Sequence, residues 1–127
     1  MKKIISTDNA PAAIGPYAQA IRYGDLLFVS GQIAIDPETG QIVEGDIEVQ
    51  TKQVMENLKA IIKEAGMTLQ NVLKCSCFLK DMEDFVKFNA VYNHYFAESL
   101  PARETVEVGR LPKDVRVEVS AICGAEE

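Results

Sequence analysis

The chain of 127 residues lacks several features on which particular protein classes depend. It has no tryptophan, a single histidine and only three cysteines, an odd number that argues against a disulfide framework. No apolar stretch approaches the roughly 20 residues of a membrane span. The apolar run behind Lys2 and Lys3 is too short for a secretory signal. We therefore expect a cytoplasmic protein without membrane contact, whose cysteines are small buried hydrophobes rather than metal ligands.

Positive charge is also scarce, with 13 Lys and Arg against 19 Asp and Glu and a formal net charge of -6. A surface that binds phosphates needs an excess of basic side chains, so the sequence disfavours nucleic acid as a partner. What is present is ordinary for a globular protein: 47% hydrophobic and 25% charged residues. The length fits one domain over residues 1–127, with a core that needs no metal or disulfide.

Hydrophobic periodicity predicts an α+β fold in the order ββαβαββ, one mixed sheet with two helices on one face. Asp46 and Asp81 are suited to cap the helices, and Gly24-Asp25 is typical of a two-residue hairpin. The turn at 111–114 joins the last two strands. The predicted helices span 47–65 and 82–98, and the predicted strands span 17–23, 26–30, 72–80, 103–108 and 115–123, with a further short strand possible at 2–5.

The composition of the strand at 26–30 bears on whether the chain assembles with copies of itself. Leu26, Leu27, Phe28 and Val29 are apolar at consecutive positions, so both faces of this strand require burial. Two helices cover only one face of the sheet, and no further helix is predicted. The economical cover for the second face is another copy of the chain, which predicts an oligomer.

Three segments place polar groups at unusual positions. Tyr17 follows a rigid Gly-Pro pair, and Ser30-Gly31 ends a very apolar strand, where glycine permits close approach of a ligand or backbone. Arg103 follows Pro101, and Glu118 lies on the next strand. If these last strands form an antiparallel hairpin, Arg103 and Glu118 approach each other on one face. The alternative interpretations are a packed tyrosine, a simple bulge, and a surface salt bridge that contributes little.

These segments together resemble one known family. Ile14-Gly15-Pro16-Tyr17, Ser30-Gly31-Gln32, Asn89 and the runs 101–108, 111–114 and 116–119 are similar to motifs of the RidA/YjgF reactive-intermediate deaminases, in order and over essentially the whole chain. The resemblance implies a chorismate-mutase-like fold assembled as a homotrimer. The sheets would form a central barrel with the helices outside, and three clefts would lie between neighbouring subunits.

The resemblance also implies an activity, the hydrolysis of reactive 2-imino acids such as 2-iminobutanoate and 2-iminopropanoate to 2-keto acids and ammonia. It implies no metal and no cofactor. By the matching motifs, Arg103 binds the substrate carboxylate and Glu118 activates water. The other implied ligand-binding residues are Tyr17, Ser30, Gly31, the backbone of Thr105 and, with a lesser or structural role, Asn89.

One departure and three alternatives accompany this expectation. Many relatives have cysteine at the position of Thr105, so the activity here would require no thiol. A non-catalytic trimer that binds 2-keto acids would share Arg103 without needing Glu118. RNA cleavage or translation inhibition is disfavoured by the acidic balance and by His94 being the one histidine. A protein-binding holdase would need an exposed apolar motif, which the sequence does not reveal.

Overall fold

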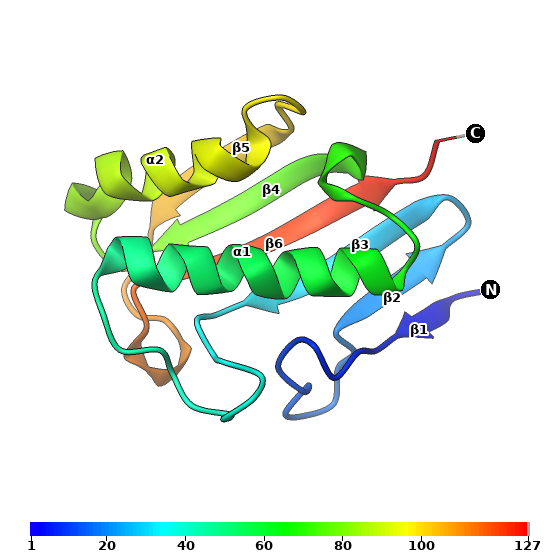
Figure 1. The fold of residues 1–127 in the computed structure, drawn as a ribbon, viewed down its shortest axis with the longest axis horizontal. Helices are drawn as coiled ribbons and strands as arrows, with labels where there is room; N and C mark the ends of the chain where they lie inside the picture. Colours follow the sequence, from blue (N-terminus) through cyan, green and yellow to red (C-terminus); the bar gives the residue numbers. More distant parts are fainter. Residues whose placement is uncertain (127) are drawn as a thin grey trace.

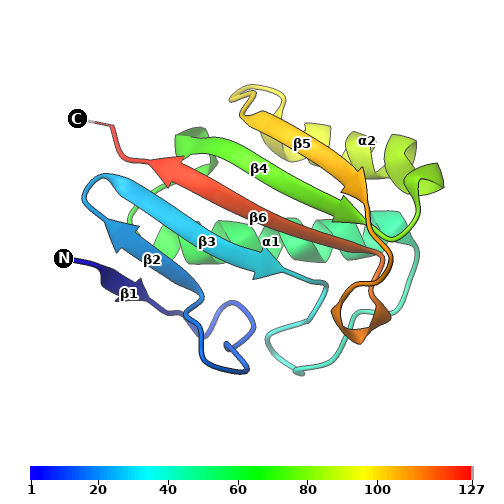
Figure 2. The same ribbon diagram turned by 180° about the vertical axis from the view of Figure 1, so that it is seen from behind.

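The computed structural model describes residues 1–126, which form a six-stranded mixed sheet with two α-helices against one face (Figures 1 and 2). The expected α+β class is confirmed, with a short N-terminal strand as the sixth member of the sheet. The strands are β1 (Lys3–Ile5), β2 (Ala20–Tyr23), β3 (Leu26–Gln32), β4 (Val72–Leu79), β5 (Ala102–Glu107) and β6 (Val117–Gly124), and the helices are α1 (Ile47–Glu64) and α2 (Phe85–Phe96).

The long helix α1 forms where its caps and apolar spacing predict. The Asp46 side chain accepts the Val49 N–H at 3.1 Å, which satisfies one of the free donors at the helix start. Glu48 in the first turn and Lys63 in the last turn complement the helix dipole. Its apolar stripe is buried against the sheet: Val54, Met55, Leu58, Ile61 and Ile62.

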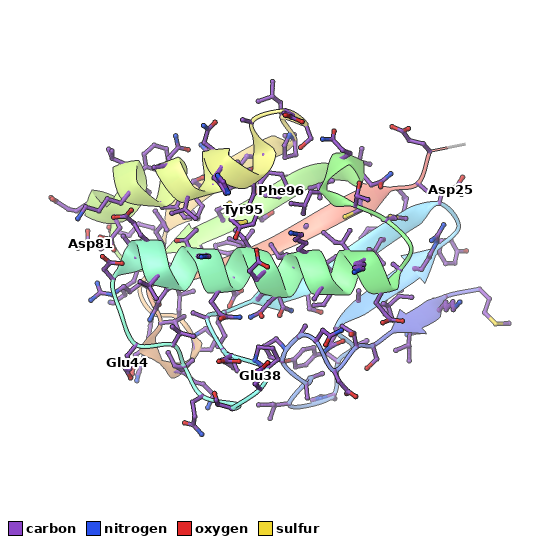
Figure 3. The ribbon with its side chains drawn as sticks, viewed as in Figure 1. Asp25, Glu38, Glu44, Asp81, Tyr95 and Phe96 are labelled. Carbon is purple, nitrogen blue, oxygen red and sulfur yellow. The ribbon has the colours of Figure 1, made fainter. Side chains whose placement is uncertain are left out.

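The second helix is shorter than the predicted span of 82–98. Asp81 caps the segment, but its carboxylate accepts the Glu83 N–H at 2.9 Å and starts a 3-10 turn over Met82–Asp84. The α-helix proper begins at Phe85. It packs on α1 (Figure 3). The Tyr95 hydroxyl of α2 donates to Glu56 of α1 at 2.7 Å.

The connection between the last two strands differs from the hairpin considered above. The sheet order is β1-β2-β3-β6-β4-β5, so β4 separates β5 from β6. β4 and β5 are parallel, and β6 is antiparallel to both β3 and β4. The physical reason is the crossover through α2, which returns the chain beside β4 in the same direction, as in other βαβ units. The prediction that β5 and β6 form a hairpin was therefore wrong.

The N-terminal hairpin follows its prediction more closely. Gly24 adopts φ 62°, the left-handed conformation that the tight turn between β2 and β3 requires. β2 begins only at Ala20, three residues later than predicted, so Tyr17 lies in the preceding irregular segment. Within residues 1–126, neither helix has the length and apolar character that crossing a membrane would demand.

The two faces of the sheet differ in burial. The face under the helices is closed, and every second residue of β6 is buried there. The opposite face of the sheet is turned toward the viewer in Figure 2. Four large apolar side chains on this face are between 40% and 52% exposed. They are Leu26, Phe28, Leu73 and Val106. The chain itself thus leaves the second face of its sheet uncovered, as the consecutive apolar residues of β3 predict.

Candidate active site

One group of the predicted site residues surrounds a cavity at the end of β3. The cavity has a volume of about 510 Å³. Its lining includes Tyr17 from the N-terminal segment, Ser30 and Gly31 from β3, Lys113 from the 3-10 turn after β5, and Glu118 from β6. The structure therefore brings together four of the seven residues that the sequence singles out.

Glu118 lies against the backbone of the neighbouring strand at Gly31. A Cβ placed on Gly31 would lie 2.5 Å from Oε2 of Glu118 and 2.9 Å from its Cδ, closer than real side chains approach. With any other residue at position 31, the Glu118 carboxylate would have to move from this place. Half-burial raises the pKa of Glu118 above its ordinary value by desolvating the charged form. A carboxylate of raised pKa at the wall of a cavity is suited to accept a proton.

Gln19 anchors the segment that carries Tyr17, and the sequence motifs did not single it out. Its side chain is 3% exposed. Its Oε1 accepts the Thr7 N–H at 2.7 Å, and its Nε2 donates to the carbonyls of Thr7 at 3.0 Å and Pro11 at 2.8 Å. These bonds fasten the N-terminal loop to the strand that follows Tyr17. A polar residue next to alanines at the start of a strand was the available signal.

Ser30 is fixed by the same strand. Its backbone N–H donates to the Gln19 carbonyl at 2.9 Å, and its Oγ donates to the Ala18 carbonyl at 2.7 Å. Because its hydroxyl proton is used in this way, Ser30 presents lone pairs to a ligand. Tyr17 is held less firmly, since its hydroxyl accepts the Ile14 N–H at 3.4 Å and its side chain is half exposed.

Arg103 and Asn89 line a second cavity, of about 380 Å³, between α2 and β5, whereas Thr105 is not among its lining residues. Arg103 projects from β5 toward α2, where its Nη1 donates to Oδ1 of Asn89 at 2.8 Å. Its Cζ lies 4.6 Å from the ring centroid of Tyr92 and 5.6 Å from that of Phe85. Among residues 1–126, no carboxylate lies within salt-bridge distance of this half-buried guanidinium.

Thr105 follows Arg103 on the same face of β5. Both pair in register with buried cysteines of β4, Arg103 with Cys75 and Thr105 with Cys77. The Thr105 hydroxyl is buried, and in the described part of the chain it has no hydrogen-bond partner of good geometry. The Arg103 guanidinium therefore keeps N–H donors that an anion could use, whereas the buried Thr105 hydroxyl lies beside the Cys77 thiol.

Arg103 and Glu118 do not meet within one chain, and the expectation that they share a face was wrong. Arg103 aligns with Cys75 and through it with Ala121, three residues from Glu118 along β6. Strand spacing and rise separate the two Cα atoms by on the order of 14 Å. Arg103 points to the helix side, whereas Glu118 alternates with buried Val117 and Val119 and points to the open side.

Comparison with known proteins identifies the family behind this arrangement. The family model described as Endoribonuclease L-PSP matches residues 7–124. A RutC family protein of Pyrococcus horikoshii is 59% identical over 126 residues, which cover 99% of this chain and 100% of that protein. The chain belongs to the RidA/YjgF family. The family was predicted from the motifs around Tyr17, Ser30 and Arg103, and this prediction is confirmed.

Two further members of the RidA/YjgF family bear on chemistry. A protein of Salmonella typhimurium named 2-iminobutanoate/2-iminopropanoate deaminase is 48% identical over 126 residues, covering 97% of this chain and 98% of that protein. The crystal structure of Escherichia coli TdcF with bound serine superposes with a TM-score of 0.93 at 42% identity, covering 98% of this chain and 99% of that one. An imine-hydrolysing role therefore has support among relatives of this RidA/YjgF chain.

Proposed function

We propose that this protein is a cofactor-independent deaminase that hydrolyses 2-imino acids, including 2-iminobutanoate and 2-iminopropanoate, to 2-keto acids and ammonia. The observation that carries the proposal is the guanidinium of Arg103, held at the wall of a cavity without a carboxylate partner among residues 1–126. A planar guanidinium binds a carboxylate through two parallel hydrogen bonds. The relatives named as imine deaminases support the same substrate class.

The separation of Arg103 from Glu118 determines how such a substrate is bound. In a 2-imino acid, the carboxylate carbon is bonded directly to the imine carbon that water attacks. A group that binds the carboxylate and a group that activates the water must therefore lie within a few ångströms of each other. Because opposite faces of one sheet cannot supply both, we propose that the cleft combines Arg103 of one subunit with Glu118 of its neighbour.

The same proposal accounts for the uncovered face of the sheet. A homotrimer with inward-facing sheets would bury Leu26, Phe28, Leu73 and Val106, which are 40–52% exposed in the single chain. Large exposed apolar side chains gathered on one face are typical of an interface. In this assembly the Glu118 cavity of one subunit and the Arg103 cavity of the next form each of three equivalent sites.

The reaction needs only water and these side chains. Arg103 holds the carboxylate, and the ionised Glu118 accepts a proton from water as its oxygen adds to the imine carbon. The nitrogen receives a proton, the carbon–nitrogen bond breaks, and ammonia leaves as the new hydroxyl loses its proton to become the keto oxygen. General base assistance of this kind contributes about 10²–10⁴-fold, and the fixed position of the substrate contributes further.

The family-model description as an endoribonuclease suggests another activity, which the site disfavours. The cavity around Glu118 has one basic lining residue, Lys113, and the Arg103 cavity has no other cation in its described lining. His94 lies elsewhere, in a groove between α1 and α2. With a net charge of -6, these surfaces are poorly suited to hold a phosphate backbone.

Imine hydrolysis is tested directly by trapping. An amino acid oxidase generates 2-iminopropanoate or 2-iminobutanoate, and semicarbazide competes for it. We expect the wild-type protein to suppress semicarbazone formation and Arg103→Ala to leave it unchanged. If the wild type suppresses nothing across small and larger amino acids, the deaminase proposal fails. Calorimetric binding of 2-keto acids would then favour the non-catalytic alternative.

Subunit mixing tests the shared cleft. Arg103→Ala and Glu118→Gln chains, each inactive alone, are unfolded together in equal amounts and refolded. In random trimers, about one quarter of the clefts receive an intact Arg103 from one chain and an intact Glu118 from the next, so about one quarter of wild-type activity returns. A cleft built within one chain would give no recovery, and that result would overturn the shared site.

A further inference from the structure

The guanidinium of Arg103 lies against two aromatic rings of α2, Phe85 and Tyr92, which we call the aromatic clamp. The distances from Cζ to the ring centroids are 5.6 Å and 4.6 Å. A cation within about 6 Å of an aromatic centroid is attracted by the negative face of the ring. The spacing of Phe85, Asn89 and Tyr92 places all three on one face of the helix. A single helix thus surrounds Arg103 with two rings and one amide oxygen.

The Tyr92 part of the clamp is built into the core. Tyr92 is only 8% exposed, and its ring packs on Phe88 and Phe96 with centroid distances of 5.8 Å and 4.8 Å. Its hydroxyl is buried beside the Cys75 thiol. The ring is therefore held by its own neighbours, and its position does not depend on Arg103.

Arg103 comes from β5, which lies at one edge of the sheet, so its long side chain needs other contacts to be fixed in place. An arginine side chain has many rotamers, and ordering it when a ligand binds reduces affinity. Among the described residues, Asn89 accepts from one of the five guanidinium N–H donors, which leaves four that a ligand could use. Contacts with the two rings and one amide order the guanidinium, and its remaining N–H groups are available to a carboxylate.

We infer that Tyr92 and Phe85 are positioning residues that form a preformed seat for a guanidinium ion and act on the substrate through Arg103. The inference rests on the proposed role of Arg103 in binding the substrate carboxylate. A preformed seat predicts a result that a purely structural role for Tyr92 does not predict. When the Arg103 side chain is removed, the seat remains and binds a free guanidinium ion.

Binding of methylguanidinium to Arg103→Ala tests the seat without any catalytic readout. We expect saturable binding by calorimetry or ligand-observed NMR in Arg103→Ala, and none in the wild type, where the arginine fills the seat. Binding persists in Arg103→Ala/Tyr92→Phe, which keeps the ring, and is lost in Arg103→Ala/Tyr92→Leu. Absence of binding to Arg103→Ala, or equal binding after Tyr92→Leu, overturns the inference. Either result leaves the deaminase proposal standing, because imine hydrolysis is measured separately.

A second measurement keeps Arg103 in place and uses 2-oxobutanoate as a stable carboxylate probe. Tyr92→Leu is expected to raise its Kd about ten-fold, as the loss of a partly buried cation–π contact would, while Tyr92→Phe restores the wild-type value. Tyr95→Leu is the matched control, since Tyr95 lies on the same helix but bonds Glu56 and leaves the Kd unchanged.

If Tyr92→Leu fails to fold by circular dichroism, Phe85→Leu replaces it in both measurements, because Phe85 is only partly buried. An unchanged Kd in a folded clamp variant contradicts the positioning role. If the wild type does not bind 2-oxobutanoate at all, the carboxylate role of Arg103 fails, while methylguanidinium binding still decides the seat.

Discussion

The carboxylate of Glu118 occupies the space in which a side chain at Gly31 would lie. Gly31→Ala is therefore expected to displace Glu118 and to lower kcat by about 10²-fold, the cost of moving a reacting group by about 1 Å. Gly109→Ala is the matched control, because Gly109 has open space at its Cβ and no positive φ. Imine-trapping assays on both variants check this. Equal activity of the two would contradict the close packing of Glu118 on Gly31.

The ionisation of Glu118 predicts an acid limb in the pH profile. Burial raises the pKa of Glu118 above its ordinary 4.5, and the general base must be ionised to act. The kcat/KM for imine hydrolysis is expected to fall as pH decreases through this raised pKa, with an apparent midpoint above 4.5. In Glu118→Gln, we expect most of the activity and the acid limb of the pH profile to be lost together. If the residual activity of this variant still showed the acid limb, the limb would belong to another group.

The same raised pKa of Glu118 predicts an effect on stability. A carboxyl whose folded-state pKa is raised stabilises the fold fully below its unfolded pKa, and this contribution is lost as pH rises through the folded pKa. At neutral pH the ionised Glu118 therefore opposes folding. Glu118→Gln is expected to have a higher Tm than the wild type at pH 7, and differential scanning calorimetry measures it. A lower Tm for the variant would contradict a raised pKa of Glu118 in the folded protein.

Because Arg103 is proposed to bind the substrate carboxylate through two parallel hydrogen bonds, we expect that lysine cannot replace it. Lys offers a point charge without the planar fork that forms two parallel hydrogen bonds. Arg103→Lys is expected to weaken 2-oxobutanoate binding by about 1.5–3 kcal/mol, the range for a hydrogen bond to a charged group. Isothermal titration calorimetry gives the Kd. Unchanged affinity would show that charge alone binds the carboxylate.

The three cysteines predict a protein that resists thiol reagents and loses stability in alkali. Burial raises the pKa of Cys75 to about 11 and that of both Cys77 and Cys123 to about 12, from 9.0. The neutral thiols stabilise the fold below pH 9, and this contribution is lost as pH rises from 9 toward 11–12. Chemical denaturation at pH 8 and pH 10.5 checks the loss. Rapid labelling by a thiol reagent under native conditions at pH 8 would contradict this burial.

The uncovered sheet face predicts a variant that separates the subunits. Phe28→Asp places a charge among the apolar side chains of this face and is expected to convert the proposed trimer to monomer, with loss of activity. Light scattering measures the mass. Val86→Asp is the control, because Val86 is 78% exposed on α2 and lies outside the proposed interface. A monomeric wild type at micromolar concentration would refute the assembly.

Local patterns in the sequence were sufficient for much of this protein. The stripe of α1, its Asp46 cap and the Gly24 turn follow from nearest neighbours along the chain, and all three appear where expected. The apolar run at 26–29 predicted a second face in need of cover, which the structure leaves exposed. The motifs around Tyr17, Ser30 and Arg103 identified the family. These features depend on short-range geometry or on residue identity, both of which a sequence contains.

Only the tertiary structure decided how distant segments meet. The parallel pairing of β5 with β4, enforced by the α2 crossover, placed Arg103 and Glu118 on opposite faces, where two alternating strands alone had suggested one face. The same crossover laid Tyr92 against Arg103, although the aromatic stripe had predicted only core packing. Side-chain alternation shows which residues share a face of one strand, but strand order determines which strands are neighbours, and that order depends on long-range packing.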